Sequence, residues 1–254
     1  MDNVQNYVDL VKEPWSRMFY DLLFIQLELP QSPRLKILDF GLGLGVTASH
    51  YAAWHDVTAI EPNHEMIENK RTENSYKQIH GGVESLAVFE DGFFDVALCH
   101  NVLEYTEDKE PIIAGIMRVL KPGGLLSLVK HNRVGRVFHH AVFWNNPKKA
   151  LEQANDSAND KSNYLGTQYI YSNDDVAKWI VKHGGKINNI LGMRVFYALG
   201  QNNSVKYEND WYQNMLALEA HIANIDEYKN AAFHNHLLIV KIDATLNLSE
   251  MGIN

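Results

Sequence analysis

A glycine-rich turn that follows a short apolar run is the feature that most restricts how this chain folds. Residues 37–45 are ILDFGLGLG, and a second apolar run, VTAI at 57–60, ends at Glu61. Glycines at the carboxyl end of a strand let a ligand lie against bare backbone at a helix N-terminus. An acid at the end of the next strand can bind both hydroxyls of a ribose. Together they predict a nucleoside-containing ligand in an α/β sheet.

The positions of the glycines and acids narrow the choice of ligand. Glycine spacing alone also fits a nicotinamide or flavin site. Here the pattern is Gly-x-Gly-x-Gly, with Asp39 two residues before Gly41. A pyrophosphate would meet a like charge at Asp39, whereas a ligand with an ammonium and a sulfonium would meet an opposite one. We therefore expect S-adenosyl-L-methionine as the cofactor.

Length and composition set the broad class of the protein. A chain of 254 residues with 46% hydrophobic content can bury one sizeable core with a lid. The single cysteine, Cys99, excludes an internal disulfide framework. No apolar run of about eighteen residues and no cationic signal start are present, which predicts a cytoplasmic protein without a membrane partner. The net charge of −8 argues against a whole-surface attraction to nucleic acid.

Alternating strand and helix patterns predict a Rossmann-like α/β fold. We expect strands at 36–40, 57–60, 77–80, 93–99, 124–130, 187–198 and 235–243, and helices at 45–54, 64–74, 110–120, 173–183 and 209–224. The sheet is then seven-stranded and mostly parallel, with one antiparallel strand. A single domain over 1–254 would comprise an N-terminal helical cap (1–34), which includes a helix starting at Pro14, a cofactor-binding core (35–130), a long loop forming a lid insertion after strand five (131–171) and the C-terminal part of the sheet (172–254).

Five motifs occur in an order that resembles class I S-adenosylmethionine-dependent methyltransferases. They are ILDFGLGLG (37–45), AIEP (59–62), GGVESL (81–86), FDVALCHNVLEY (94–105) and LKPGGLLSL (120–128). Three segments show a finer resemblance to the bacterial tRNA 5-carboxymethoxyuridine methyltransferase group. They are FDVALCHNVLEY, GMRVFY (192–197) and MLALEAHI (215–222). That family methylates the carboxylate of a modified wobble uridine. The alternatives are a methyltransferase of a small metabolite and a non-catalytic cofactor-binding protein.

The resemblance implies roles for individual residues of the cofactor site. Gly41 and Gly43 would approach the methionine part of the cofactor, with Asp39 near its ammonium. Glu61, followed by Pro62, would hold the ribose hydroxyls. The adenine amino group would meet the segment Val83, Glu84 and Ser85, unless Glu84 is only a first-turn helix charge. His100, at the end of strand four, would line the methyl-transfer pocket, unless it is a packed, hydrogen-bonded core histidine.

Candidate residues for the methyl acceptor lie later in the chain. Arg194 suits an anionic group, because a guanidinium pairs with a carboxylate through two hydrogen bonds. Tyr197 would help to orient that group, and His100 would serve as a base if the nucleophile were a phenol or an amine. Despite twelve histidines, no set with ligand spacing appears, so we predict no metal site.

A local inversion of charge marks the segment after strand five. Residues 130–149 hold five Lys or Arg, three His and no acid, with aromatic residues interleaved. Cations beside aromatics suit phosphate contacts and base stacking, which would make this segment the footprint of a tRNA partner. The alternative is an amphipathic lid whose aromatics pack on the core while its cations are solvated.

Overall fold

A central twisted sheet organises the computed structural model, which describes residues 7–9, 11–155, 160–162 and 166–243. Its seven strands lie in the order β3-β2-β1-β4-β5-β9-β8. Their bounds are Lys36–Phe40 (β1), Asp56–Glu61 (β2), Lys77–His80 (β3), Phe94–His100 (β4), Leu120–His131 (β5), Gly185–Met193 (β8) and His234–Lys241 (β9). β9 pairs antiparallel with both β5 and β8, and the other pairs are parallel. The predicted mostly parallel sheet with one antiparallel strand is confirmed.

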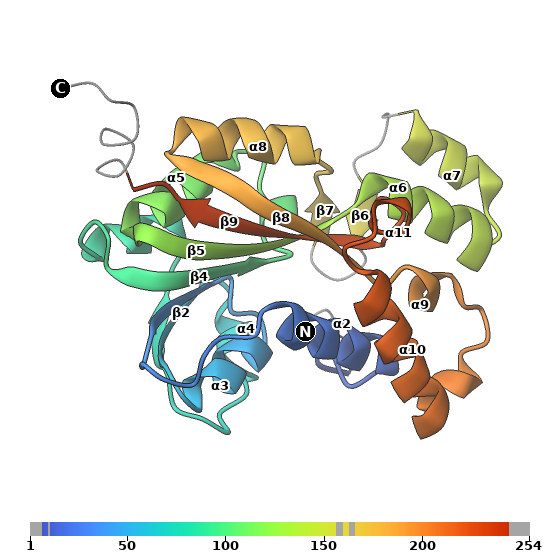
Figure 1. Cartoon of the computed structure of the whole chain (residues 1–254), viewed down its shortest axis with the longest axis horizontal. Helices are drawn as coiled ribbons and strands as arrows, with labels where there is room; N and C mark the ends of the chain where they lie inside the picture. The colour runs from blue at the N-terminus through green and yellow to red at the C-terminus, as the bar shows by residue number, and fades with distance from the viewer. Residues whose placement is uncertain (1–6, 10, 156–159, 163–165, 244–254) are drawn as a thin grey trace.

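Helices cover both faces of the sheet, as its apolar strands require. Figure 1 shows α5 (Glu110–Val119) and α8 (Asn173–Lys182) above the sheet, and α3 (Val46–Ala52) and α4 (His64–Glu68) below it. Successive residues of a strand point to opposite faces. Leu38 and Phe40 therefore join the core under α5 and α8, whereas Ile37 joins the core over α3.

The N-terminal helix α2 (Pro14–Gln26) begins at Pro14, as predicted, because proline fits the first helical turn. It buries Met18, Leu22 and Leu23 against the sheet and against α10 (Asn209–Ile222). A hydrogen bond of 2.6 Å from the Tyr212 hydroxyl to Asp21 joins the two helices. This packing holds α2 beside the carboxyl ends of the strands.

The segment that we expected to form a long loop after β5 is largely helical. It contains α6 (Arg133–Phe138), a π-helical turn η3 (His139–Phe143), α7 (Pro147–Ala154) and a hairpin of β6 (Asp160–Ser162) and β7 (Gly166–Gln168). Asparagines supply the helix starts: Asn132 Oδ1 accepts from Val134 N, and Asn146 Oδ1 accepts from Lys149 N. Side-chain caps of this kind satisfy backbone donors that a helix leaves open.

Three predicted boundaries were wrong, each for a local reason. The helix expected over 64–74 ends at Glu68, where Asn69 Nδ2 bonds back to Glu65 O. β5 begins at Leu120 and contains the Pro-Gly-Gly turn, which causes a register shift against β4. The strand expected over 187–198 ends at Met193, because Arg194 takes a left-handed conformation with φ 61°.

Short helical turns complete the connections. They are η1 (Val83–Val88), η2 (Leu103–Tyr105), α9 (Phe196–Leu199), η4 (Ser204–Tyr207) and α11 (Asp226–Lys229). Within the described part of the chain, no helix has the length and apolar character needed to cross a membrane.

Candidate active site

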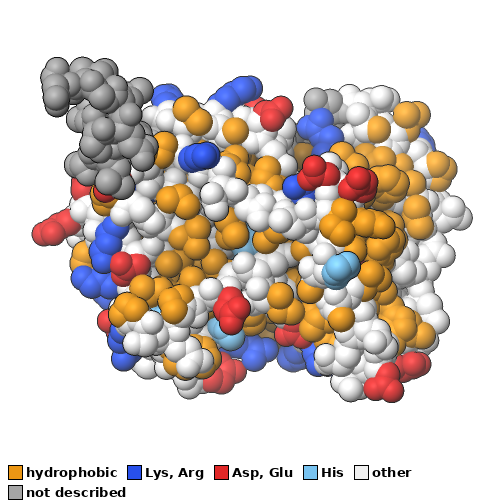
Figure 2. All heavy atoms as spheres, viewed as in Figure 1, with side chains coloured by type: hydrophobic (Ala, Val, Ile, Leu, Met, Phe, Trp, Pro, Cys, Tyr) orange, Lys and Arg blue, Asp and Glu red, His pale blue; other side chains and the backbone are white. Residues whose placement is uncertain are grey.

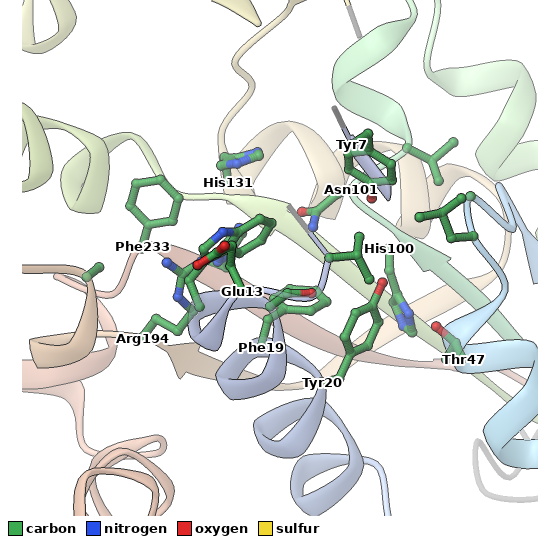
Figure 3. A pocket seen from close by; sticks show the side chains of 18 of the residues that line it. Tyr7, Glu13, Phe19, Tyr20, Thr47, His100, Asn101, His131, Arg194 and Phe233 are labelled. Carbon is green, nitrogen blue, oxygen red and sulfur yellow. The ribbon is translucent and has the colours of Figure 1, made fainter. Parts of the chain in front are cut away.

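One large cavity lies at the carboxyl ends of β1, β2, β4 and β5, where α/β sheets bind ligands. Its volume is about 1020 Å³, and its lining comes from α2, the glycine turn, the insertion, α9 and η4. Figure 3 shows His100, Tyr20 and Thr47 on one side of the cavity, and His131, Phe233 and Arg194 on the other. The cavity thus has two ends, one at the glycine turn and one at the insertion.

The glycine turn is held open by left-handed backbone and by Glu61. Gly41 and Gly43 have φ values of 83° and 54°. A Cβ at Gly41 would come within 2.3 Å of Val102 Cγ2, so that position also lacks room for a side chain. Glu61 accepts hydrogen bonds from Gly43 N at 2.8 Å and from Asn63 N at 2.9 Å. The Glu61 carboxylate therefore fixes the turn as well as lining the cavity.

Three buried acceptor atoms around this turn have no partner among the described residues. They are Asp39 Oδ2, His100 Nδ1 and Asn101 Oδ1. Burial, and then the charge of Glu61, raise the pKa of Asp39 to about 7. Buried acceptors without donors are costly, so a ligand that brings N–H donors and positive charge would stabilise this end. The ammonium and sulfonium of S-adenosylmethionine fit that requirement.

A chain of buried hydrogen bonds fixes the tautomer of His100. Gln26 Nε2 donates to Gly192 O at 2.9 Å, so Gln26 Oε1 accepts from His236 Nδ1, also at 2.9 Å. His236 Nε2 must then accept from the Ser127 hydroxyl at 2.7 Å, and Ser127 Oγ accepts from His100 Nε2 at 2.8 Å. His100 Nδ1 is left as an unprotonated acceptor. Burial holds the pKa of His100 well below its usual value, so the ring is neutral.

The opposite end of the cavity carries two buried cations. Arg194 and Lys206 are each 8% exposed, and neither forms an ion pair with a carboxylate in the described part of the chain. Aromatic rings surround Arg194, whose Cζ lies 5.3 to 5.5 Å from the ring centres of Trp15, Tyr197 and Phe233. Burial lowers the pKa of Arg194 to about 10 and that of Lys206 to about 8. This end is suited to a planar or aromatic group that carries an anion.

Comparisons with known proteins agree with this arrangement. The family described as "Methyltransferase domain" matches residues 38–128. The chain is 27% identical over 219 residues to the tRNA 5-carboxymethoxyuridine methyltransferase of Escherichia coli K12, covering 80% of this chain and 79% of the relative. It is 34% identical over 113 residues to the ubiquinone biosynthesis O-methyltransferase of Xanthomonas oryzae, covering 42% and 47% of the two chains.

Solved structures show the same fold. A possible histamine N-methyltransferase from Thermotoga maritima superposes with a TM-score of 0.61 at 16% identity, covering 94% of this chain and 96% of that one. A putative S-adenosylmethionine-dependent methyltransferase from Listeria monocytogenes gives 0.59 at 15% identity, with 90% and 98% covered. The protein is an S-adenosylmethionine-dependent methyltransferase. Its cofactor is S-adenosyl-L-methionine.

The cavity of the methyltransferase contains most of the residues that the sequence singled out. Lining residues among them are Asp39, Gly41, Gly43, Glu61, Pro62, His100, Arg194 and Tyr197. Val83, Glu84 and Ser85 lie outside the lining, in η1, where the Glu84 carboxylate accepts from Gly82 N at 2.6 Å. Their contact with adenine stays a prediction.

The basic segment of the methyltransferase does not form one charged surface. Lys130 is 2% exposed and Arg136 is 8% exposed, and Arg136 donates to Gln168 Oε1 at 2.7 Å. Lys148 lies on the surface. The expectation of a single basic footprint over 130–149 is therefore wrong for its buried members. Among the residues that the structure describes, no group of three or more His, Cys, Asp or Glu is placed to hold a metal ion.

Several residues that line the cavity of the methyltransferase escaped sequence analysis. Lys206, Trp15 and His131 line the cavity, but none lies in a recognised motif. Trp15 directly follows the proline that starts the helix, and this position was its only local signal in the sequence. Figure 2 shows hydrophobic side chains gathered at the right of the molecule.

Proposed function

We propose that this methyltransferase esterifies a carboxylate on a modified wobble uridine of tRNA. The observation that carries the proposal is the pair of buried cations, Arg194 and Lys206, at the end of the cavity away from Asp39 and Glu61. The cofactor end is acidic and suits a cationic methyl donor, whereas the acceptor end is basic and suits an anion. The E. coli relative, matched over most of both chains, is named for a carboxymethoxyuridine substrate.

The geometry is sufficient for methylation of a carboxylate without a base. A carboxylic acid with a pKa near ~4 is already ionised at neutral pH. Arg194 would hold one face of the carboxylate, and the surrounding rings exclude water and position the acceptor for in-line attack. S-adenosylmethionine supplies the methyl group when bound. Tyr197 OH is buried without a partner among the described residues and is available to the acceptor.

The mouth of the cavity supports entry of a base from RNA. Trp144 and Tyr207 line the cavity and are also 61% and 68% exposed. Exposed aromatic rings at an opening are suitable platforms for stacking a base that has left its neighbours. A base stacked on either ring would lie beside the cavity that contains Arg194.

The test supplies tritiated S-adenosylmethionine and total tRNA from a strain that lacks this gene. Label that enters tRNA and is released by mild alkali indicates a methyl ester, which is the expected result. An Arg194→Ala variant should lose this transfer while keeping its affinity for the cofactor, because Arg194 lies at the other end of the cavity. Absence of label in tRNA, with the cofactor bound, would overturn the proposal.

A second candidate is a methyltransferase of a small anionic metabolite. The observation in its favour is enclosure, because Trp15, Phe19 and Tyr20 of α2 cover the cavity from the N-terminal side. The Xanthomonas relative is named for an O-methylation in ubiquinone biosynthesis. Label recovered from a deproteinised metabolite extract rather than from tRNA would favour this candidate.

A further inference from the structure

A carboxylate and a histidine form a buried pair at the acceptor end of the cavity. Glu104 Oε1 accepts from His131 N at 2.8 Å and lies 3.3 Å from His131 Nδ1. The side chains of His131 and Glu104 are 14% and 2% exposed. Because Nδ1 faces a carboxylate, it carries the ring proton, and Nε2 keeps its lone pair. His131 lines the cavity, and no described residue bonds its Nε2.

The backbone of this region makes the pair rigid. Glu104 lies in η2, and its carbonyl oxygen accepts from Tyr169 N at 2.7 Å. His131 is the last residue of β5 and pairs with His234 of β9. The ring of Phe233 lies 5.5 Å from the His131 ring and 5.3 Å from Arg194 Cζ. The histidine and the anion-binding guanidinium therefore flank one aromatic ring.

Esterification of a carboxylate makes no use of this pair. The carboxylate is ionised before transfer and releases no proton, so a base has nothing to accept. A hydroxyl nucleophile differs, because its proton must leave as the new bond forms. A histidine oriented by a buried carboxylate is the arrangement that serves as a general base in many enzymes.

We propose that Glu104 and His131 give the methyltransferase a second acceptor class, molecules that carry a phenolic hydroxyl beside an anionic group. Arg194 and Lys206 bind the anion, and the hydroxyl lies against His131 Nε2. The hydroxyl oxygen forms a bond to the methyl carbon while the bond from that carbon to sulfur breaks, leaving the electron pair on sulfur. The hydroxyl proton passes to His131 Nε2. His131 is the catalytic base, and Glu104 is a positioning residue.

Charged groups from several elements surround this pair. Burial lowers the pKa of His131, the Glu104 carboxylate raises it, and the charges of Arg136 in α6 and Arg194 after β8 lower it further. The ring of His234 in β9 lies 4.7 Å from the His131 ring. Lys109 and Lys130 are further cations that interact with Glu104. His131 is thus unprotonated at neutral pH, the state that a base requires. The rate should fall as the pH drops through the pKa of His131, below its usual value of about 6.5.

The experiment follows label from tritiated S-adenosylmethionine into 3,4-dihydroxybenzoate, with the full-length protein. Wild type is expected to form an alkali-stable methyl ether. His131→Gln should lower kcat by about 100-fold or more, the typical contribution of a general base. Glu104→Gln should lower kcat and shift the acidic limb of the pH profile downward, because the carboxylate no longer raises the pKa of His131. Glu90→Gln, an exposed acid elsewhere, is the matched control and should behave as wild type.

Nuclear magnetic resonance of the His131 ring provides a readout apart from turnover. Its titration should move to lower pH in Glu104→Gln, whereas a merely structural role for Glu104 would not give this specific shift in a folded variant. No ether from wild type, or full kcat in His131→Gln, would overturn the inference. Loss of tRNA labelling with ether formation retained would instead count against the tRNA substrate alone, so the two failures are distinguishable.

Discussion

Asp39 is the residue for which a cationic ligand is expected to change the protonation state most. Its carboxyl is buried beside Glu61 at the end of β1, and one oxygen has no partner among the described residues. Burial raises the pKa of Asp39 to about 7. In the free protein the neutral form of the Asp39 carboxyl is thus favoured below that pH. The contribution of this neutral form to the free energy of unfolding is lost as the pH rises through 7.

Binding of the cofactor should expel the proton of Asp39. At pH 6.5 the free protein holds much of this carboxyl protonated, and an ammonium nearby would restore ionisation. The cofactor's own amino group, with a pKa of ~8, is already an ammonium at that pH. Calorimetry in two buffers of different ionisation enthalpy should therefore report about half a proton or more released per cofactor bound at pH 6.5. Asp39→Asn should release close to none, and an equal proton count for the two proteins would contradict the assignment.

The relay from α2 to His100 shows how distant elements share one site. A backbone carbonyl fixes which way the Gln26 amide of α2 faces. His236 of β9 and Ser127 of β5 then fix, one after the other, which ring nitrogen carries the proton in the histidine at the end of β4. Each link is a hydrogen bond whose donor is decided by the link before it. Five elements, β8 with the Gly192 carbonyl included, therefore act together to present one lone pair to the cavity.

Removing the Ser127 hydroxyl should allow the His100 ring to adopt either tautomer. In Ser127→Ala the Nε2–H of His100 loses its acceptor, so the ring should sample both tautomers, and cofactor affinity should fall about 5- to 10-fold, equivalent to about 1–1.4 kcal/mol. Nitrogen-15 chemical shifts of the ring measure the tautomer directly. Ser49→Ala, which removes a buried serine outside this chain of bonds, is the control. An unchanged His100 spectrum in Ser127→Ala would rule out the relay.

The cofactor end of the site was predictable from sequence because its residues follow strand ends within short motifs. Asp39, Gly41 and Glu61 are specified by the apolar runs that precede them. The other end was predicted in part, because Arg194 and Tyr197 were candidates and line the cavity. Lys206, His131 and Trp15 were missed, since they come from segments that only the tertiary fold brings together. The early end of the predicted strand was not predictable either. It is caused by the φ of 61° at Arg194, and arginine is a residue type that rarely adopts this conformation.

At the scale of the whole molecule, the cavity has an acidic end and a basic end. Asp39 and Glu61 belong to the first half of the sheet, whereas Arg194 and Lys206 belong to the chain that follows β8. Glu13 also lines the cavity but accepts a hydrogen bond of 2.7 Å from the Tyr207 hydroxyl. The cavity thus carries opposite charges at its two ends, and these charges come from distant parts of the sequence.

The basic end of the cavity should bind an anionic acceptor more weakly in mild alkali. Lys206, with its pKa lowered to about 8, is cationic below that pH and neutral above it. The KM for an anionic acceptor should therefore rise as the pH goes from 7 to 9. Lys206→Met should have a high KM throughout and lose this dependence, whereas Lys148→Met on the surface should retain it. A flat KM in wild type would count against Lys206 as a substrate contact.

This polarity also sets how products leave. Transfer to a carboxylate turns a sulfonium into a neutral thioether and an anion into a neutral ester, so a single chemical event removes the charge on sulfur and the charge on the acceptor. The acidic end then keeps only the attraction of Asp39 for the ammonium, and the basic end faces an acceptor that it no longer holds by charge. The cavity would therefore bind the two products less tightly than the two substrates. Once empty, it would again favour a cationic methyl donor and an anionic acceptor over the products that have just formed.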